Sequence, residues 1–97
     1  PCEAVEVHAD WSDLELPLGE NGVVCQSDEA GNMVHYSEGS QEQWLATYGA
    51  AMMLAGWKKD PKVKGNESNL YFVKGKKRVN VNVYDYEGTG LTINKTY

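Results

Sequence analysis

The chain has 97 residues, of which 41% are hydrophobic and 24% are charged, and its formal net charge is −5. This length predicts one domain near the lower end of sizes that bury an adequate core, and the hydrophobic share excludes an intrinsically disordered protein. No apolar run approaches the roughly 18 residues of a membrane-spanning helix.

Charge is divided unevenly along the chain. Residues 1–57 contain ten Asp or Glu and no Lys or Arg, whereas residues 58–78 contain eight Lys or Arg and two Asp or Glu. Such polarity can steer a charged partner to one end of the molecule. The alternative is that the basic residues only solubilise turns and strand ends and pair with the acidic half.

Residues 1–21 are acidic and irregular, and we expect them to form an arm or covering segment on a core made by residues 22–97. The alternation from Val5 to His8 suits a short strand or an extended arm. Leu14, Leu16 and Leu18 also alternate, but Pro17 restricts that stretch to a sheet edge or a covering loop.

Two cysteines, Cys2 and Cys25, permit one disulfide. Closing a loop of this size contributes roughly 3 kcal/mol in the chain-entropy model, and small exported domains often contain such a bridge. The alternative is a pair of unrelated thiols, one in a strand and one near a frayed terminus.

Two short apolar runs, residues 23–26 and 33–36, predict strands. The stretch between them, residues 27–32, is rich in turn-forming residues. We therefore expect a β-hairpin here.

A helix is predicted to follow Ser40 and to end at Gly56. Ser40 can cap the first turn, with Gln43 placed to complete a capping box. Gly56 suits the left-handed residue after the helix, and Trp57 would then fold back toward Met52 in a Schellman motif. The face expected to pack on a sheet consists of Trp44, Tyr48, Ala51, Met52 and Ala55, with Leu45 at its edge.

After the helix we expect a long charged loop, residues 58–69, and then three strands. These are residues 70–73, 79–84 and 91–94, of which the second shows the clearest alternation. The order is β-β-α-β-β-β, and the predicted fold is a single α+β domain in two layers, with one helix packed on a mostly antiparallel sheet of about five strands. The side chains expected beneath the helix are Leu70, Phe72, Val79, Val81, Val83, Leu91 and Ile93.

The opposite face of the sheet is the predicted binding surface. Its expected members are Tyr71, Val73, Asn80, Asn82, Tyr84, Thr92 and Asn94, because they alternate with the buried positions. Amides and aromatic rings can bind an extended polar ligand such as a glycan, or a partner protein. The alternative is an ordinary solvent-facing sheet.

The basic turn, formed by Lys74, Lys76, Lys77 and Arg78, is the second candidate binding surface. Nucleic acid is an unlikely partner because the acidic half of the chain opposes the phosphate attraction that dominates such binding. Met53 and Leu54 lie off the predicted core face, so they could flank a homodimer contact or be plain helix formers.

No catalytic residues, metal ligands or cofactor are predicted. Cys25 and His35 could form a thiol–imidazole pair, but an imidazole on an ordinary strand is far more often structural. His8, Asp10, Asp13 and Glu15 offer oxygen and nitrogen ligands, yet their spacing does not match a calcium loop.

Two sequence features together resemble small extracytoplasmic domains of bacterial envelope lipoproteins and related secreted proteins. One is a helix that ends in Ala55-Gly56-Trp57, and the other is the hairpin formed by residues 70–75 and 79–83. The resemblance implies export and a non-enzymatic role, and it transfers no site residues. Pro1 before Cys2 departs from the lipoprotein pattern.

From these features we expect a non-enzymatic binding module of the bacterial cell envelope or the secreted space. The alternative is an acidic inhibitor or immunity-type protein that masks a basic site on a target protein.

Overall fold

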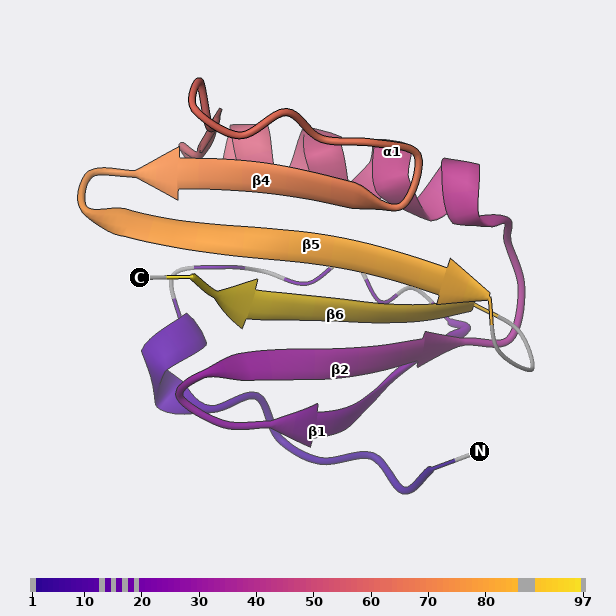
Figure 1. The fold of residues 1–97 in the computed structure, drawn as a ribbon. Coiled ribbons are helices and arrows are strands. Elements are labelled where there is room, and N and C mark those ends of the chain that lie inside the picture. The colour runs from indigo at the N-terminus through magenta and orange to yellow at the C-terminus, as the bar shows by residue number, and fades with distance from the viewer. Residues whose placement is uncertain are drawn as a thin grey trace.

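The computed structural model describes residues 2–12, 14, 16, 18, 20–85 and 89–96. Within them the chain forms a six-stranded antiparallel sheet in the order β1-β2-β6-β5-β4-β3, with one α-helix behind it (Figure 1). The elements are a short 3-10 turn η1 (Ala9–Trp11), β1 (Gly22–Ser27), β2 (Gly31–Tyr36), α1 (Gln41–Leu54), β3 (Lys58–Lys59), β4 (Asn69–Lys74), β5 (Lys77–Asp85) and β6 (Thr89–Lys95).

The predicted α+β class is confirmed, but the prediction of about five strands is wrong because it omits β3. The stretch predicted as a loop from residue 58 begins with two strand residues, Lys58 and Lys59, which pair with Val73 and Phe72 of β4. A two-residue strand made of lysines has no alternating apolar pattern to detect. Only the neighbouring strand β4 makes it a strand.

The ends of α1 follow from local chemistry, as the sequence predicts. The Ser40 side chain accepts a hydrogen bond from the Gln43 backbone N–H, and the Gln43 side chain accepts one from the Ser40 N–H. The helix ends at Leu54, and Gly56 just beyond it adopts the predicted left-handed conformation, with φ +94°. Trp57 N–H then donates to the Met52 carbonyl over 3.0 Å, which completes the predicted Schellman motif.

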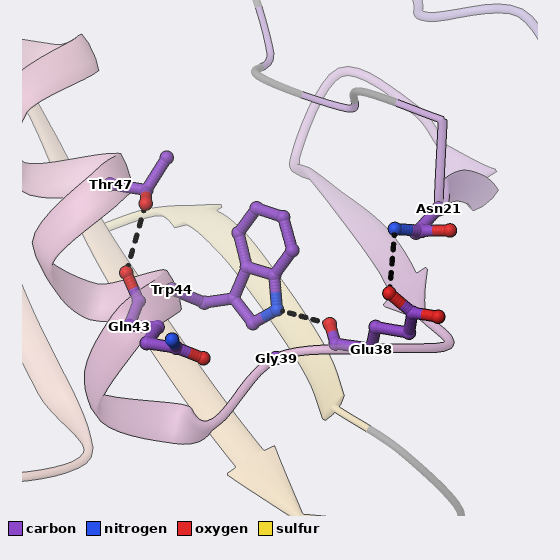
Figure 2. A pocket seen from close by; sticks show the side chains of 6 residues that line it. All are labelled: Asn21, Glu38, Gly39, Gln43, Trp44 and Thr47. Carbon is purple, nitrogen blue, oxygen red and sulfur yellow. Dashed lines mark hydrogen bonds between the residues drawn. The ribbon is translucent and has the colours of Figure 1, made fainter.

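The first turn of α1 is also tied to the loop before it. The Trp44 indole N–H donates to the Glu38 carbonyl over 2.8 Å (Figure 2). The Trp44 ring stacks on Tyr36 of β2 with ring centroids 3.6 Å apart. This contact joins the start of the helix to the far half of the sheet.

One side of α1 packs on β4 and β5. Tyr48 and Met52 are the buried helix residues, and Trp44, Leu45 and Ala55 pack against the same core while partly exposed. The predicted core positions of the sheet are all buried except Leu70, which is partly exposed: Phe72, Val79, Val81, Val83, Leu91 and Ile93. Trp57 is buried as well.

A second element covers the same face of the sheet beside α1. We call the described residues between positions 9 and 18 the covering segment. Trp11 and Leu14 are buried in the core, and Leu16 and Leu18 pack against it. In Figure 1 this part of the chain passes behind β6 and β2, on the side where α1 lies. The sequence predicted a segment lying on a core made by residues 22–97, whereas Trp11 and Leu14 are themselves part of that core; Pro17 lies outside the described residues.

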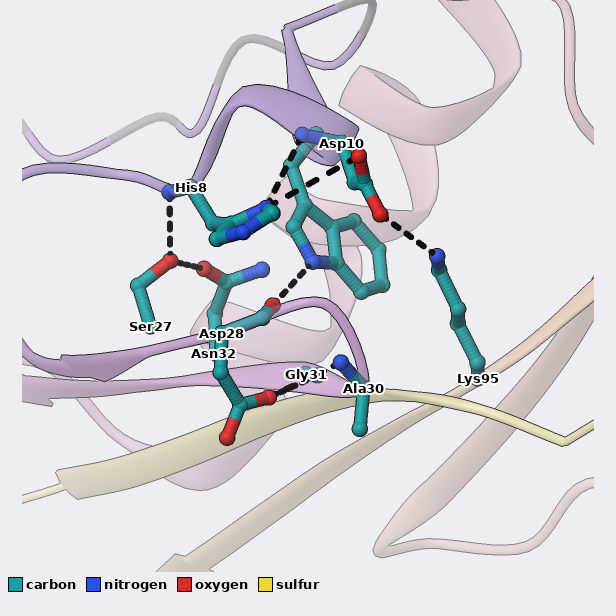
Figure 3. Close-up of polar contacts among 9 residues, drawn as sticks. His8, Asp10, Ser27, Asp28, Ala30, Gly31, Asn32 and Lys95 are labelled. Atoms are coloured by element: carbon teal, nitrogen blue, oxygen red, sulfur yellow. Dashed lines mark hydrogen bonds and ion pairs between the residues drawn. The ribbon is translucent and has the colours of Figure 1, made fainter.

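Polar contacts fix the covering segment to the strands (Figure 3). The Trp11 indole N–H donates to the Asp28 carbonyl over 2.8 Å, and the Asp10 carboxylate lies 3.6 Å from the Lys95 ammonium. Just before the segment, His8 N–H donates to the Ser27 hydroxyl of β1 over 2.7 Å. The turn between β1 and β2 and the last strand therefore hold a segment that has little regular structure of its own.

One edge of the sheet is bordered by the N-terminal residues, and the other is formed by the two-residue strand β3. Residues 2–8, which we call the arm, run beside β1, with the predicted disulfide between Cys2 and Cys25 and a hydrogen bond from Val5 N–H to the Val24 carbonyl. At the other edge, β3 pairs with β4 and Asp60 N–H donates to the Tyr71 carbonyl. A bordered edge and a very short edge strand made of lysines limit strand-to-strand association between molecules.

Candidate functional site

The sheet face opposite α1 remains partly accessible to solvent, and we call it the open face. Side chains alternate along β5, so that Val79, Val81 and Val83 are buried while Asn80, Asn82 and Tyr84 are partly exposed. Figure 1 is drawn with this face toward the viewer and α1 behind it. The predicted members on the neighbouring strands, Tyr71, Val73, Thr92 and Asn94, are likewise not buried.

Asparagine side chains form a hydrogen-bonded row across the open face. The Nδ2 atoms of Asn80 and Asn82 both donate to Asn69 Oδ1, over 3.2 and 3.0 Å. They also donate to the carbonyls of Leu70 and Ser68, respectively. These bonds use the donor ends of Asn80 and Asn82 and so orient both side chains. Among the described residues no hydrogen bond uses their Oδ1 atoms, which remain able to accept from a ligand.

Asn69 is a member of this row that the sequence prediction missed. It is the first residue of β4 and pairs with Asn82 of β5. The predicted strand began one residue later, so Asn69 was placed in the loop. Extending the alternation of Tyr71 backward by two positions could have found it.

Aromatic and amide side chains on the open face lie across glycines of neighbouring strands. A Cβ at Gly90 of β6 would collide with the Tyr84 ring, and a Cβ at Gly31 of β2 would collide with the Asn94 side chain. The Tyr84 ring therefore lies along the sheet surface. A ring held in this position can stack with an apolar face of a ligand at little entropic cost.

The four basic residues predicted as a binding turn have different environments. Lys74 donates to the Ala55 carbonyl over 2.8 Å, where it caps the end of α1, and its ammonium lies 5.9 Å from the Trp57 ring centroid. Arg78 lies 3.4 Å from the carboxylate of Asp60, whose side chain is only 4% exposed. Lys76 and Lys77 are exposed at the β4–β5 turn. Lys74 and Arg78 thus have structural contacts that the sequence did not reveal.

A shallow cavity of about 380 Å³ lies beside the start of α1, lined by Asn21, Glu38, Gly39, Gln43, Trp44 and Thr47 (Figure 2). Its polar groups bond largely to one another: Asn21 Nδ2 to the Glu38 carboxylate, the Trp44 indole to the Glu38 carbonyl, and the Thr47 hydroxyl to the Gln43 carbonyl. These bonds hold the loop and the helix start together. The cavity is therefore a weaker candidate for ligand binding than the open face.

The most perturbed titratable groups are structural. The hydroxyls of Tyr36 and Tyr48 share a hydrogen bond in the core. Burial raises the pKa of Tyr36 to about 12, although the bond with Tyr48 opposes the shift. Burial, and then the proximity of Tyr36, raise the pKa of Tyr48 well above its ordinary value. Both phenols are neutral at physiological pH, so neither is a candidate nucleophile or base.

The alternative of a thiol–imidazole pair is excluded because the Cys25 sulfur is bonded to Cys2. Among the residues described, no group of three or more His, Cys, Asp or Glu side chains could hold a metal ion. Of the four residues weighed as calcium ligands, His8 and Asp10 lie side by side, with His8 Nδ1 accepting from Asp10 N–H. Asp13 and Glu15 lie outside the described residues.

No protein-family model, curated protein or solved structure matches this chain. No helix in the described part of the chain is long and apolar enough to cross a membrane.

Proposed function

We propose that this protein is a non-enzymatic binding module of the extracytoplasmic space, and that its open face binds an extended polar ligand such as a glycan. The observation that carries the proposal is the bonded row of Asn69, Asn80 and Asn82 beside the Tyr84 ring. The row holds amides in fixed positions on a sheet face that is otherwise accessible to solvent.

The chemistry of the open face suits a sugar chain. Amide oxygens accept hydrogen bonds from hydroxyl groups, and an aromatic ring that lies flat can pack against the C–H face of a sugar ring. The row crosses from β4 to β5, and Asn80 pairs with Asn94 of β6. A ligand lying across the strands would therefore meet successive polar groups.

The disulfide supports the extracytoplasmic part of the proposal. Bridges of this kind persist in oxidising compartments and are rare in reducing ones. The Cys2–Cys25 bridge joins the arm to β1. A protein whose arm is fastened in this way is best suited to an oxidising environment.

A second candidate function, an acidic inhibitor, has one observation in its favour. The arm and the start of the covering segment carry Glu3, Glu6 and Asp10, and all three residues are exposed. An acidic exposed segment could cover a basic site on a target protein.

Titration followed by backbone amide NMR shifts tests the proposal. The probes are soluble hexasaccharides of glucose and of N-acetylglucosamine, with octa-arginine as the probe for the inhibitor alternative. We expect a hexasaccharide to shift the amides of β4, β5 and β6, and the variants Asn80→Ala and Asn82→Ala each to weaken binding about fivefold or more, since each removes a polar contact.

Asn21→Ala is the matched control because it removes an exposed amide away from the open face. It should leave the affinity unchanged. The proposal is wrong if neither hexasaccharide shifts the open face, or if Asn21→Ala weakens binding as much as Asn82→Ala. Shifts confined to the arm on addition of octa-arginine would favour the inhibitor instead.

A further inference from the structure

Three apolar side chains are exposed near the end of α1. Leu54 is 90% exposed, Met53 is 53% exposed, and Val63, in the loop after β3, is 39% exposed. Leu54 is the last residue of the helix and is followed directly by the Schellman turn. The helix end is therefore fixed in place while its final side chain extends into solvent.

The loop that contains Val63 runs beside α1. Cβ atoms placed at Gly49 of α1 and at Gly65 of the loop would each lie 3.6 Å from a methyl group of Leu70. Met53 is one turn after Gly49 on the same side of the helix. Met53 and Val63 thus border the same surface, and Figure 1 shows the loop passing the end of α1.

Lysines lie near these apolar side chains, because Lys62 and Lys64 flank Val63 in the sequence and the bond from Lys74 to the Ala55 carbonyl brings the end of β4 to the end of α1. The exposed members are Lys59 of β3, Lys62 and Lys64 of the loop, and Lys76 of the β4–β5 turn, whereas Lys58 pairs with Val73 and so lies on the open face. Asp60 lies among them but is buried and paired with Arg78. Glu67 is therefore the only exposed acidic residue between positions 58 and 78.

We propose that this surface, which we call the docking end, binds an anionic lipid bilayer. It consists of Met53, Leu54 and Val63 together with four exposed lysines, Lys59, Lys62, Lys64 and Lys76. Isolated apolar side chains that project among basic residues suit insertion at the boundary between headgroups and acyl chains. The lysines contribute by attraction to the negative surface potential of anionic lipids.

Charge decides between a bilayer and a second copy of this chain. In a symmetric dimer formed through Leu54, the lysines of one copy would face the same lysines of the other. Like charges brought together at an interface oppose association. An anionic lipid surface neutralises them instead. The open face lies on the sheet rather than on the docking end, so it would stay accessible to a ligand.

Vesicle flotation tests the proposal on the full chain. The probes are vesicles of phosphatidylcholine alone and vesicles of equal parts phosphatidylcholine and phosphatidylglycerol. We expect binding only to the vesicles that contain phosphatidylglycerol. Binding should weaken as ionic strength rises from about 0.05 M to about 0.5 M, because salt screens surface charges.

Two variants separate the apolar and the electrostatic contributions. Leu54→Asp should lower the partition coefficient about tenfold or more, since it replaces the inserted side chain by a charge of the wrong sign. Replacing Lys62 and Lys64 by Ala should lower it about 25-fold, at about fivefold for each lysine near the surface. Both sites are exposed, so circular dichroism should show the native fold.

Val5→Asp is the matched control because Val5 is 45% exposed on the arm and the substitution makes the same chemical change. It should leave binding within about twofold of the parent protein, allowing for the long-range effect of one added charge. The proposal is overturned if phosphatidylglycerol vesicles are not bound, or if Val5→Asp and Leu54→Asp weaken binding equally. It is also overturned if light scattering shows a dimer that Leu54→Asp abolishes, or if the docking end binds an oligo-glutamate peptide but no vesicle.

Discussion

Two parts of the molecule cover the same face of the sheet by different means. Helix α1 forms its own backbone hydrogen bonds, with a local capping box at its start and a Schellman motif at its end, to which Lys74 of β4 adds one bond. The covering segment has one short 3-10 turn, η1, and depends on contacts with strands distant in sequence, such as the bond from Trp11 to Asp28. The comparison teaches that a small sheet can complete its core with an irregular segment, provided that the segment is cross-linked to the strands.

The strongest test of this comparison removes one large core side chain from α1 and one from the covering segment. Trp11→Ala should lower the free energy of unfolding by about 4 kcal/mol, and Met52→Ala should lower it by about 3 kcal/mol, because both leave cavities in one shared core. Chemical denaturation measures both. If Trp11→Ala cost less than about 1 kcal/mol, the covering segment would not belong to the core.

Removing the disulfide should destabilise the N-terminal residues more than α1. The bridge spans a sequence separation of 23 residues, and replacing both cysteines by serine should lower the free energy of unfolding by about 3 kcal/mol. Hydrogen exchange should quicken in residues 3–12 and β1 more than in α1, since local contacts support the helix by itself. If hydrogen exchange became faster by the same factor in residues 3–12, β1 and α1, the arm and α1 would instead open as one unit.

The Tyr36–Tyr48 hydroxyl pair joins β2 to α1 in the core. Tyr36→Phe or Tyr48→Phe alone should cost about 1–3 kcal/mol, because each leaves the other hydroxyl buried without its partner. The double substitution should cost less than the sum of the two. A double-mutant cycle by denaturation measures this coupling, and additive costs would show that the pair does not stabilise the fold.

The same pair predicts a loss of stability at alkaline pH. Because the folded-state pKa of Tyr36 is raised to about 12, the folded protein retains a proton that the unfolded chain loses near its ordinary pKa of about 10. Its contribution is thus fully present below pH about 10 and is lost as the pH rises toward 12. Thermal unfolding between these pH values should show the decline, and it should be smaller in the double Phe variant.

The smallest expected effect concerns the local cap of α1. Ser40→Ala should lower the free energy of unfolding by about 1 kcal/mol, because it removes the acceptor for the Gln43 N–H. Ser12→Ala in the covering segment is the comparison, since the Ser12 bond to Ala9 uses the backbone N–H and survives the change. A cost for Ser12→Ala equal to that of Ser40→Ala would contradict the view that the loss at Ser40 comes from its side-chain hydrogen bond.

Local patterns explain what could be predicted of the fold. Two signals depend only on residues close in the sequence. They are the alternation around Val81 and the helix-capping residues Ser40 and Gly56. The short strand β3 escaped prediction because its pairing depends on β4 alone.

The candidate site was only partly visible from the sequence. Alternation placed Asn80, Asn82 and Tyr84 on one face, but it missed Asn69, because only the register of β4 against β5 brings that amide beside Asn82. The clustering of basic residues in the sequence also grouped Lys74 with Lys76 as one binding surface. Only packing shows that Lys74 caps α1, whereas Lys76 stays exposed.

The sequence alone determined the class of fold, the ends of the helix and which side chains alternate, since these depend on backbone geometry and on near neighbours. The tertiary structure decided where the acidic N-terminal residues lie, which lysines remain exposed and how the asparagines bond to one another. Those features depend on contacts between strands far apart in the chain, and no local pattern encodes them.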